Sequence, residues 1–260
     1  MKNIITDGGA IGNGTADDTA AIQAALNLGG NWYFPAGTYK VTSTLLLNKP
    51  ATGLFGDNMS TTVINYTGTA CAIQSGKFAV TLLWTRISDL RITAPNINIG
   101  YCLEMYSMQF SRITNVWLSG SNNVNCTNLH LGANWGVTEA TYNIIDGCYM
   151  GNAKNGIVLT DGANNNTISN TRIQPNLAGG NAILALGQNS GSVSCNSVIS
   201  CGFEYPGNIS NGIWLAQNTN GFFMYANRFE ALNTGIFVGS SCVNTVDSGQ
   251  YYSGCTNNKI

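Results

Sequence analysis

A six-residue phrase that recurs along most of the chain constrains the fold more than any other feature of the sequence. Its copies begin with an apolar residue, at Ile87, Ile113, Ile145, Ile168, Val198, Met224 and Val246. A second phrase interleaves with the first and begins at Asn155, Asn181, Asn211 and Thr234. Successive copies of the first phrase are 22 to 32 residues apart, so the chain is built from repeats of unequal length.

Both phrases are too short for a helix and alternate apolar with polar residues, so we expect short strands. Each repeat can hold two or three strands joined by turns, and stacking the repeats as parallel strands buries one continuous core. The sequence therefore predicts an all-β fold, a right-handed single-stranded parallel β-helix of about seven to nine coils. An antiparallel sandwich would need regular two-residue turns, whereas the Asn-Gly pairs at Asn155 and Asn211 open the second phrase.

An open solenoid end exposes strand edges and needs a cap. Residues 1–40 are expected to form this cap and the first strand, with a short helix over about 17–28. Asp17 would be its N-cap and Gly29 would follow its end. The apolar face that would cover the first coil consists of Ile22, Ala25 and Leu26. Residues 41–260 would then form the coils of one continuous domain.

The low content of charge excludes several classes of partner. Charged residues make up 9% of the chain, against roughly a quarter in an ordinary domain, and the net charge is −1. Eleven cations are too few for the basic surface that nucleic acid or an anionic membrane requires. No apolar run approaches the roughly 20 residues that span a bilayer. We therefore expect neither a nucleic-acid nor a membrane partner.

The eight cysteines point to the compartment of synthesis rather than to a metal site. The first ten residues lack the apolar core of a secretory signal, which predicts synthesis in the cytoplasm and cysteines that remain thiols. Their spacing contains no Cys-x-x-Cys pair and no Cys/His cluster. The sequence therefore predicts no metal site and no cofactor.

Motifs near the N-terminus resemble a known superfamily. They are Asp7-Gly-Gly-Ala10, Gly12-Asn-Gly14, the segment 17–23 and the segment 34–39. Together they resemble the opening of the pectate-lyase-like right-handed β-helix superfamily, which includes bacteriophage tailspikes and capsule depolymerases as well as pectin-degrading enzymes. Asn13 stands where that family usually has Asp. The resemblance implies the fold rather than the reaction, because hydrolases, lyases, epimerases and inert virion proteins share it.

Register along the first phrase predicts which side chains face out. The fourth and sixth residues of each copy should point into the core, and the fifth and seventh should point outward. In the last copy, this numbering places Gly249 and Tyr251 inward and Gln250 and Tyr252 outward. The seventh position carries Glu204 and Glu230 on successive coils. The same outward face is expected to carry Arg172, Arg228, Gln174, Trp117 and Tyr149 as substrate-binding residues.

Stacked strands bring this pair of carboxylates close to the spacing of a known mechanism. Neighbouring strands lie about 4.8 Å apart, and a retaining glycosidase holds its two carboxyls about 5–5.5 Å apart. Glu204 and Glu230 are therefore candidate catalytic residues. The alternative is a solvated ladder in which Arg228 is an ion-pair partner. His130, the only histidine, alternates outward and is expected to be a solvated imidazole.

The second phrase carries large apolar residues at its outward middle position. They are Val158, Leu184, Trp214 and Phe237. Four such side chains in a row favour burial against another chain. Because tailspikes of the resembled superfamily are homotrimers, the row is predicted to be part of a subunit contact; a turn insertion folded over it is the alternative.

Together with the resemblance, these observations predict a tailspike-like virion protein, exposed on the phage tail at the host cell surface, that binds bacterial surface polysaccharide, with endo-glycosidase hydrolysis as its candidate reaction. Other tail proteins would be further partners. The first alternative is a non-enzymatic structural or receptor-binding β-helix. The second is a polysaccharide lyase, which would need an arginine base such as Arg172 or Arg228 and a calcium-binding carboxylate cluster that the sequence lacks.

Overall fold

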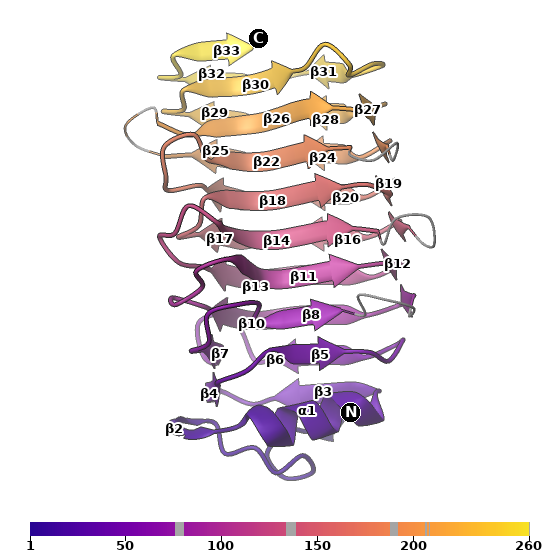
Figure 1. Ribbon diagram of the computed structural model, residues 1–260, viewed down its shortest axis with the longest axis vertical. Helices are drawn as coiled ribbons and strands as arrows, with labels where there is room; N and C mark the ends of the chain where they lie inside the picture. Colours follow the sequence, from indigo (N-terminus) through magenta and orange to yellow (C-terminus); the bar gives the residue numbers. More distant parts are fainter. Residues whose placement is uncertain (76–80, 134–138, 188–191, 206, 208, 260) are drawn as a thin grey trace.

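The computed structural model describes residues 1–75, 81–133, 139–187, 192–205, 207 and 209–259. These residues wind into coils that stack along one axis, with the helix at the N-terminal end and the C-terminus at the other (Figure 1). One parallel sheet receives a strand from each of nine coils within the described part of the chain. The predicted all-β parallel β-helix is therefore confirmed.

This nine-stranded sheet, called here the long-strand sheet, forms one wall of the solenoid. Its strands are β5 (Leu45–Leu47), β8 (Ile73–Ser75), β11 (Gly100–Tyr106), β14 (Cys126–Gly132), β18 (Asn155–Thr160), β22 (Asn181–Leu186), β26 (Asn211–Gln217), β30 (Thr234–Val238) and β33 (Asn257–Lys259). Four of these strands contain the second sequence phrase, from Asn155 to Thr234.

The opposite wall is a larger sheet, called here the bent sheet, in which most coils contribute two short strands and two coils contribute one long strand. Its first strands are β1 (Lys2–Asn3), β2 (Asn13–Asp17), β3 (Asn31–Phe34), β4 (Gly37–Val41), β6 (Gly53–Gly56), β7 (Thr62–Tyr66), β10 (Arg86–Thr93) and β13 (Arg112–Ser119). It continues with β16 (Ile144–Asp146), β17 (Tyr149–Gly151), β20 (Thr167–Ser169), β21 (Arg172–Gln174), β24 (Ser197–Ile199), β25 (Gly202–Glu204), β28 (Phe223–Tyr225), β29 (Arg228–Glu230), β31 (Val246–Ser248) and β32 (Tyr251–Ser253).

Very short strands precede the bent sheet on several coils. They are β9 (Leu82–Leu83), β12 (Met108–Gln109), β15 (Ala140–Thr141), β19 (Ala163–Asn164), β23 (Val193–Ser194) and β27 (Thr219–Asn220). All the pairings between coils are parallel, and equivalent residues lie over one another from coil to coil.

Two columns of left-handed residues turn the coils, the first from Ala51 onward and the second from Asp89 onward. The first bend, just before the bent sheet, contains Ala51, Trp84, Phe110, Tyr142, Asn165, Cys195, Gly221 and Asn244. The second bend, in the middle of the bent sheet, contains Asp89, Asn115, Gly147, Asn170, Ser200, Ala226 and Gly249. Every one of these residues has φ between 48° and 65°, a region that Gly, Asn and Asp tolerate best.

A ladder of buried amides lies directly behind the first bend. The Asn143 side chain donates a hydrogen bond to Asn166 Oδ1 at 2.9 Å, and that of Asn166 donates to Asn196 Oδ1 at 3.0 Å. The Asn166 amide nitrogen also donates to the Ala140 carbonyl oxygen at 2.9 Å. Because these three side chains are buried and bonded to backbone groups, they fix the course of the chain through the bend.

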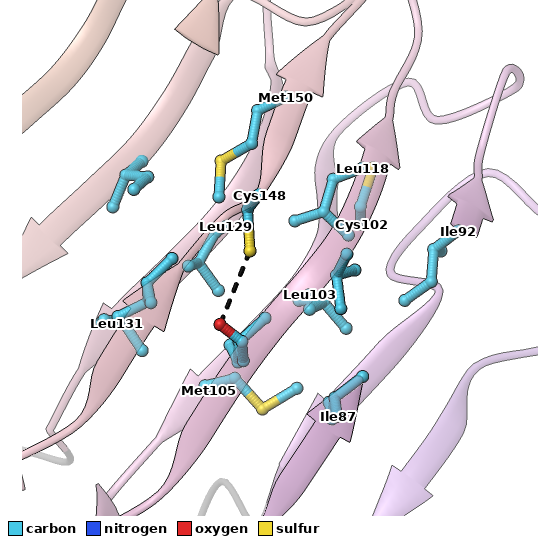
Figure 2. Close-up of a cluster of buried hydrophobic side chains, with 14 of the residues drawn as sticks. Ile87, Ile92, Cys102, Leu103, Met105, Leu118, Leu129, Leu131, Cys148 and Met150 are labelled. Atoms are coloured by element: carbon cyan, nitrogen blue, oxygen red, sulfur yellow. Dashed lines mark hydrogen bonds between the residues drawn. The ribbon is translucent and has the colours of Figure 1, made fainter. Parts of the chain in front are cut away.

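Apolar side chains from both walls fill the interior. Figure 2 shows Ile92 and Leu118 of the bent sheet together with Leu103 and Leu129 of the long-strand sheet, and all four are fully buried. Cys148 points into the same core, where its thiol donates to the Ile113 carbonyl oxygen at 3.5 Å. All eight cysteines are free thiols.

The capping helix, α1 (Thr19–Leu28), begins later than the sequence suggested. Its N-cap is Asp18, whose carboxylate makes no cap hydrogen bond and instead accepts the backbone N–H groups of Ile11 and Gly12 at 2.6 and 3.1 Å. Asp17 is the last residue of β2, so the prediction that it is the N-cap was wrong. The apolar face of the helix (Ile22, Ala25 and Leu26) is buried, as expected.

The last copy of the first phrase lies one residue away from its predicted register. Val246 pairs with Phe223 rather than with Met224, and Tyr252 rather than Tyr251 stacks on Phe229. The inward placement of Gly249 and Tyr251 was therefore wrong, as was the outward placement of Gln250 and Tyr252. The true equivalent of Met224 is Asp247, and a phrase defined by an apolar first residue missed it.

Candidate functional site

The predicted carboxylates lie side by side on the outer face of the bent sheet. β25 and β29 pair so that Gly202 lies beside Arg228, Phe203 beside Phe229 and Glu204 beside Glu230. Both phenylalanines are fully buried, which fixes the direction of the flanking residues, because successive side chains in a strand alternate. The two glutamates therefore emerge on the same outer face.

Each glutamate forms an ion pair with its own arginine. The guanidinium of Arg172 contacts Glu204, which also accepts a hydrogen bond from Gln174 Nε2 at 2.9 Å. Arg228 contacts Glu230, its neighbour two positions along the same strand. The arginine side chains are 58% exposed, so these pairs lie in contact with solvent. On this face, each of the two carboxylates is therefore neutralised by one guanidinium group, and these charged residues form a ladder along neighbouring strands.

A hollow of about 380 Å³ opens in the middle of this ladder. It lies where Gly202 replaces the large side chains of neighbouring coils, and a Cβ atom added to Gly202 would meet no atom within 4 Å. The residues that line it are Asn170, Thr171, Arg172, Ser200, Gly202, Phe203, Glu204 and Arg228. The hollow is thus bordered by donors from guanidinium groups and acceptors from a carboxylate.

The two predicted aromatic residues continue the ladder below the hollow, but their rings contact neighbours. The Arg91 guanidinium lies 3.8 Å from the ring centroid of Trp117. Tyr149 meets Trp117 edge to face at 5.1 Å, and Arg172 lies 5.7 Å from the Tyr149 ring. The structure therefore brings all seven predicted residues onto one face, while the Trp117 ring is partly covered by Arg91 rather than open to a ligand.

The predicted apolar row runs along the outer face of the long-strand sheet. Val158, Leu184, Trp214 and Phe237 lie over one another on successive coils. The rings of Trp214 and Phe237 stack at 4.0 Å and 15°. All four side chains are half-buried, so part of their apolar surface is covered within the subunit.

Below the apolar row, the same column contains a buried polar cluster that the sequence did not reveal. His130 is 3% exposed, so the prediction of a solvated imidazole was wrong, although the side chain does point outward. Its ring stacks on Tyr101 at 4.8 Å and meets Tyr106 edge to face at 5.0 Å. Its Nε2 atom lies 2.8 Å from Thr160 Oγ1, and its Nδ1 atom lies 3.9 Å from Glu104 Oε1.

Burial in this cluster makes both tyrosines harder to ionise. Loss of hydration, together with the nearby Glu104 carboxylate, raises the pKa of Tyr101 and that of Tyr106. The sequence does contain an indication of this outward column, because Leu103 and Glu104 are in register with Ile157 and Val158, which lie two coils further along the chain. On those earlier coils the two residues before Leu103 and Leu129 are Tyr101-Cys102 and Thr127-Asn128, which differ from the openings of the four copies by which the second phrase was recognised.

Two further features bear on the chemistry. Among residues that the structure describes, no group of three or more His, Cys, Asp or Glu side chains is placed to hold a metal ion. In the same part of the chain, no helix combines the length and the apolar character needed to cross a membrane.

The coils, the two walls and the capping helix define a parallel β-solenoid with polar residues on one outer wall. The sequence matches the family described as rhamnogalacturonase A/epimerase, pectate lyase-like, over residues 1–257. The chain therefore belongs to this family. A search of curated proteins finds no match.

Solved structures of similar fold come from phages and from polysaccharide enzymes. A tailspike protein of the Acinetobacter baumannii bacteriophage Fri1, described as a capsular polysaccharide depolymerase, matches 98% of this chain with TM-score 0.65 and 12% identity. The active domain of tailspike protein 2 of bacteriophage CBA120 matches 100% of it with TM-score 0.64 and 13% identity. The chain covers 58% and 42% of these two proteins.

A third similar structure is an epimerase module that the alignment covers almost completely. The A-module of mannuronan C-5 epimerase from Azotobacter vinelandii matches 100% of this chain, which covers 97% of the module, with TM-score 0.55 and 14% identity. At these identities the likeness concerns the fold.

Proposed function

We propose that this protein is a polysaccharide-binding β-helix of the tailspike type, and that it binds bacterial surface glycan at the Gly202 hollow. The observation that carries the proposal is the hollow itself, which is bordered by Arg172, Glu204 and Arg228 on an exposed wall. Its volume of about 380 Å³ lies within the roughly 300–1,000 Å³ of small-molecule sites. The phage and polysaccharide-enzyme structures of the same fold support this class of ligand.

The chemistry of the hollow suits a sugar with several hydroxyl groups. Each hydroxyl both donates and accepts hydrogen bonds, and the hollow offers guanidinium donors beside carboxylate acceptors. Since Arg172 and Arg228 are each paired with a glutamate, the site has little net charge and suits a neutral sugar residue. The absence of a side chain at Gly202 provides the space for the ring.

A second candidate function, retaining glycoside hydrolysis by Glu204 and Glu230, is favoured by their register. Adjacent strands set their backbones about 4.8 Å apart, close to the spacing that a retaining mechanism uses. In this structure, however, both carboxylates are occupied by arginines, whereas the reaction needs one to hold a proton and the other to attack the sugar. Binding is therefore the better supported function.

One substitution tests the binding proposal. Gly202→Trp fills the hollow and is expected to weaken binding to extracted capsular polysaccharide or lipopolysaccharide by about tenfold or more, measured by calorimetry. Ser197→Trp is the control, because Ser197 faces outward on the same coil but does not line the hollow. Wild-type protein that retains none of the extracted glycans, or equal binding by Gly202→Trp, would overturn the proposal.

Hydrolysis is tested separately by mass analysis of the products. If the wild type shortens a bound glycan, Glu204→Gln and Glu230→Gln should each abolish the shortening while leaving the fold intact. An unsaturated sugar end among the products would instead indicate a lyase. Binding without products would leave the protein as a receptor-binding β-helix.

As part of the same proposal, the protein would be a homotrimer on the virion tail, contacting other tail proteins and the host surface. The apolar row from Val158 to Phe237 would be part of the subunit contact. Trp214→Glu combined with Phe237→Glu should then convert the oligomer to a monomer, as measured by light scattering. An unchanged oligomer, or a wild type that is already monomeric, would remove the row from the interface.

A further inference from the structure

Exposed aromatic side chains occupy the first bend on three successive coils. Trp84, Phe110 and Tyr142 are 60%, 50% and 54% exposed. Their φ angles of 56°, 50° and 57° lie in the left-handed region, which bulky residues rarely adopt. Behind the bend on these coils, the backbone N–H groups of Thr85 and Ser111 donate to Ser111 Oγ and Asn143 Oδ1 at 2.9 and 3.1 Å, and that of Asn143 donates to Asn166 Oδ1 at 3.0 Å. Because these groups hold the backbone in the bend, a small or polar residue at the outer position would serve it better.

Other coils show that the bend does not require an aromatic side chain. The same column holds Asn165, Gly221 and Asn244, which are residues suited to the conformation. Phe110 and Tyr142 stack at 5.1 Å with nearly parallel rings, yet both remain half open to solvent. Three aromatic residues in an unfavourable conformation, with much of their surface exposed, indicate a contact with something outside the chain.

Two arginines close to the aromatic residues in the sequence lack a carboxylate partner among the residues that the structure describes. Arg86 and Arg112 follow Trp84 and Phe110 by two residues and pair directly in the sheet. In the described part of the chain, neither guanidinium has a carboxylate oxygen within 4.0 Å, in contrast to Arg172 and Arg228. Like charges at directly paired positions repel each other, so this arrangement has a cost that a bound anion would remove.

The acidic residues nearest in register are engaged elsewhere. Asp146, one coil above Thr114, accepts hydrogen bonds from Ser169 and Asn170 at 2.6 and 2.8 Å. Asp89, at the second bend, accepts one from Asn115 at 3.1 Å. Both carboxylates are thus held by uncharged donors.

The arginines line a second hollow, of about 390 Å³, on the outer face of the bent sheet. Its lining residues are Phe55, Arg86, Ser88, Arg112 and Thr114. Two guanidinium groups can hold one anionic group by paired hydrogen bonds, and the hydroxyls of Ser88 and Thr114 can bond to neighbouring sugar hydroxyls. The exposed rings offer apolar surface to the C–H face of a sugar.

We infer that this surface, formed by Trp84, Phe110, Arg86 and Arg112, is a second glycan-binding site that takes a negatively charged sugar residue. This inference depends on the proposed function in one respect, namely that the ligand is a polysaccharide. Arg86 and Arg112 lie on the part of the bent sheet that precedes the second bend. Gly202 lies on the part that follows this bend, and on a later coil. The two sites differ in charge, because here the arginines are not neutralised.

The double variant Arg86→Gln/Arg112→Gln tests this inference. The probes are polygalacturonate, which carries carboxylates, a sulfated galactan and the neutral polysaccharide dextran. Wild-type protein should bind at least one anionic probe more tightly than dextran, and the binding of the anionic probe should weaken as NaCl is raised, since salt screens exposed charges. The double variant should lose about tenfold or more of this affinity, because charge-assisted hydrogen bonds are lost.

Three controls separate the site from its alternatives. Lys49→Gln/Lys154→Gln removes the same charge elsewhere and should leave affinity within about twofold, whereas an equal loss would mean nonspecific attraction. Trp84→Ala should weaken binding while the salt dependence persists. In the Gly202→Trp background, Arg86→Gln/Arg112→Gln should still reduce affinity for the anionic probe by about tenfold, so failure of either site can be recognised without the other.

Two results would overturn the inference. One is a wild-type protein that binds neither anionic probe, and the other is a folded double variant, judged by its circular dichroism melt, that binds as the wild type does. Preference between the two anionic probes would identify the recognised group as carboxylate or sulfate.

Discussion

The two bends of the coil share a left-handed backbone, and both have buried polar groups behind them, but they differ in the side chains that face solvent. At the second bend, polar residues such as Asp89 and Asn115 face solvent, and the following residues, such as Cys148 and Cys201, place thiols in the core. At the first bend, the polar side chains lie inside as the amide ladder, and aromatic residues face solvent. The left-handed conformation is common to both.

This difference separates what the backbone needs from what the surface does. At the second bend, residues suited to a left-handed conformation occupy the column itself, and their side chains serve the turn. At the first bend, the inner ladder holds the turn, which leaves the outer position free for side chains chosen for another purpose. Aromatic residues in the left-handed conformation occur in the first-bend column and not in the second, and this difference is the reason for inferring a binding surface at the first bend.

The largest expected effect comes from breaking the inner ladder at the first bend. Asn166→Ala leaves the backbone N–H of Asn143 and the carbonyl oxygen of Ala140 without partners, and should lower the free energy of unfolding by about 3 kcal/mol or more. Asn170→Ala, at the second bend of the same coil, removes an exposed hydrogen bond and should cost about 1 kcal/mol or less. Urea unfolding measures both, and equal costs would contradict the comparison.

The next effect concerns the thiols behind the second bend. Burial raises the pKa of Cys148 and that of Cys201 to about 12, from an ordinary value of 9.0. Well below pH 9, at about pH 7, both thiols are protonated in the folded and the unfolded state. Between pH 9 and 12 the unfolded chain ionises first, so the free energy of unfolding should fall, by about 2 kcal/mol per thiol at pH 10.5.

Cysteine variants isolate this contribution. Between about pH 8 and pH 10.5, Cys148→Ala and Cys201→Ala should each lose less stability than the wild type does, as measured by urea unfolding at both pH values. Cys195→Ala, an exposed thiol at the first bend, is the matched control and should follow the wild type. A wild-type loss retained in full by the buried variants would show that these thiols do not govern the alkaline transition.

The smallest expected change in the free energy of unfolding comes from exchanging residues within the first-bend column. Trp84→Asn should raise the free energy of unfolding by about 1 kcal/mol, because Asn accepts the left-handed conformation and little buried surface is lost. The reverse exchange, Asn165→Trp, should lower it by a similar amount. Thermal melts of both variants measure this, and a destabilised Trp84→Asn would mean that the tryptophan serves the fold after all.

Much of the fold could be predicted because a solenoid repeats its physics on every coil. The phrases starting from Ile87 to Met224 have the predicted register, and that register alone placed Glu204 beside Glu230. The prediction failed at the last coil, where Asp247 occupies a position that earlier coils fill with an apolar residue. The period of apolar residues indicates which side chains face the interior, so it cannot be recognised where an interior position is polar.

The surface sites were harder to predict, since they depend on contacts between coils. Arg228 was considered as an ion-pair partner, but the pairing of Arg172 with Glu204 depends on side-chain geometry across two strands. The first bend did leave a signal, because Asn143, Asn166 and Asn196 each stand two residues before a phrase begins. By contrast, the tryptophan at position 84 gives no sign in the sequence that its backbone is left-handed, because neighbouring groups impose that conformation.

The Gly202 hollow is a single missing side chain in an otherwise filled column. On other coils that column holds Trp117, Tyr149, Arg172 and Arg228. Exchanging a glycine with one of these residues would move the hollow along the solenoid axis by one strand spacing, about 4.8 Å, without altering the core behind it. If the hollow binds glycan as proposed, such an exchange would move the point of contact stepwise along a polymeric ligand.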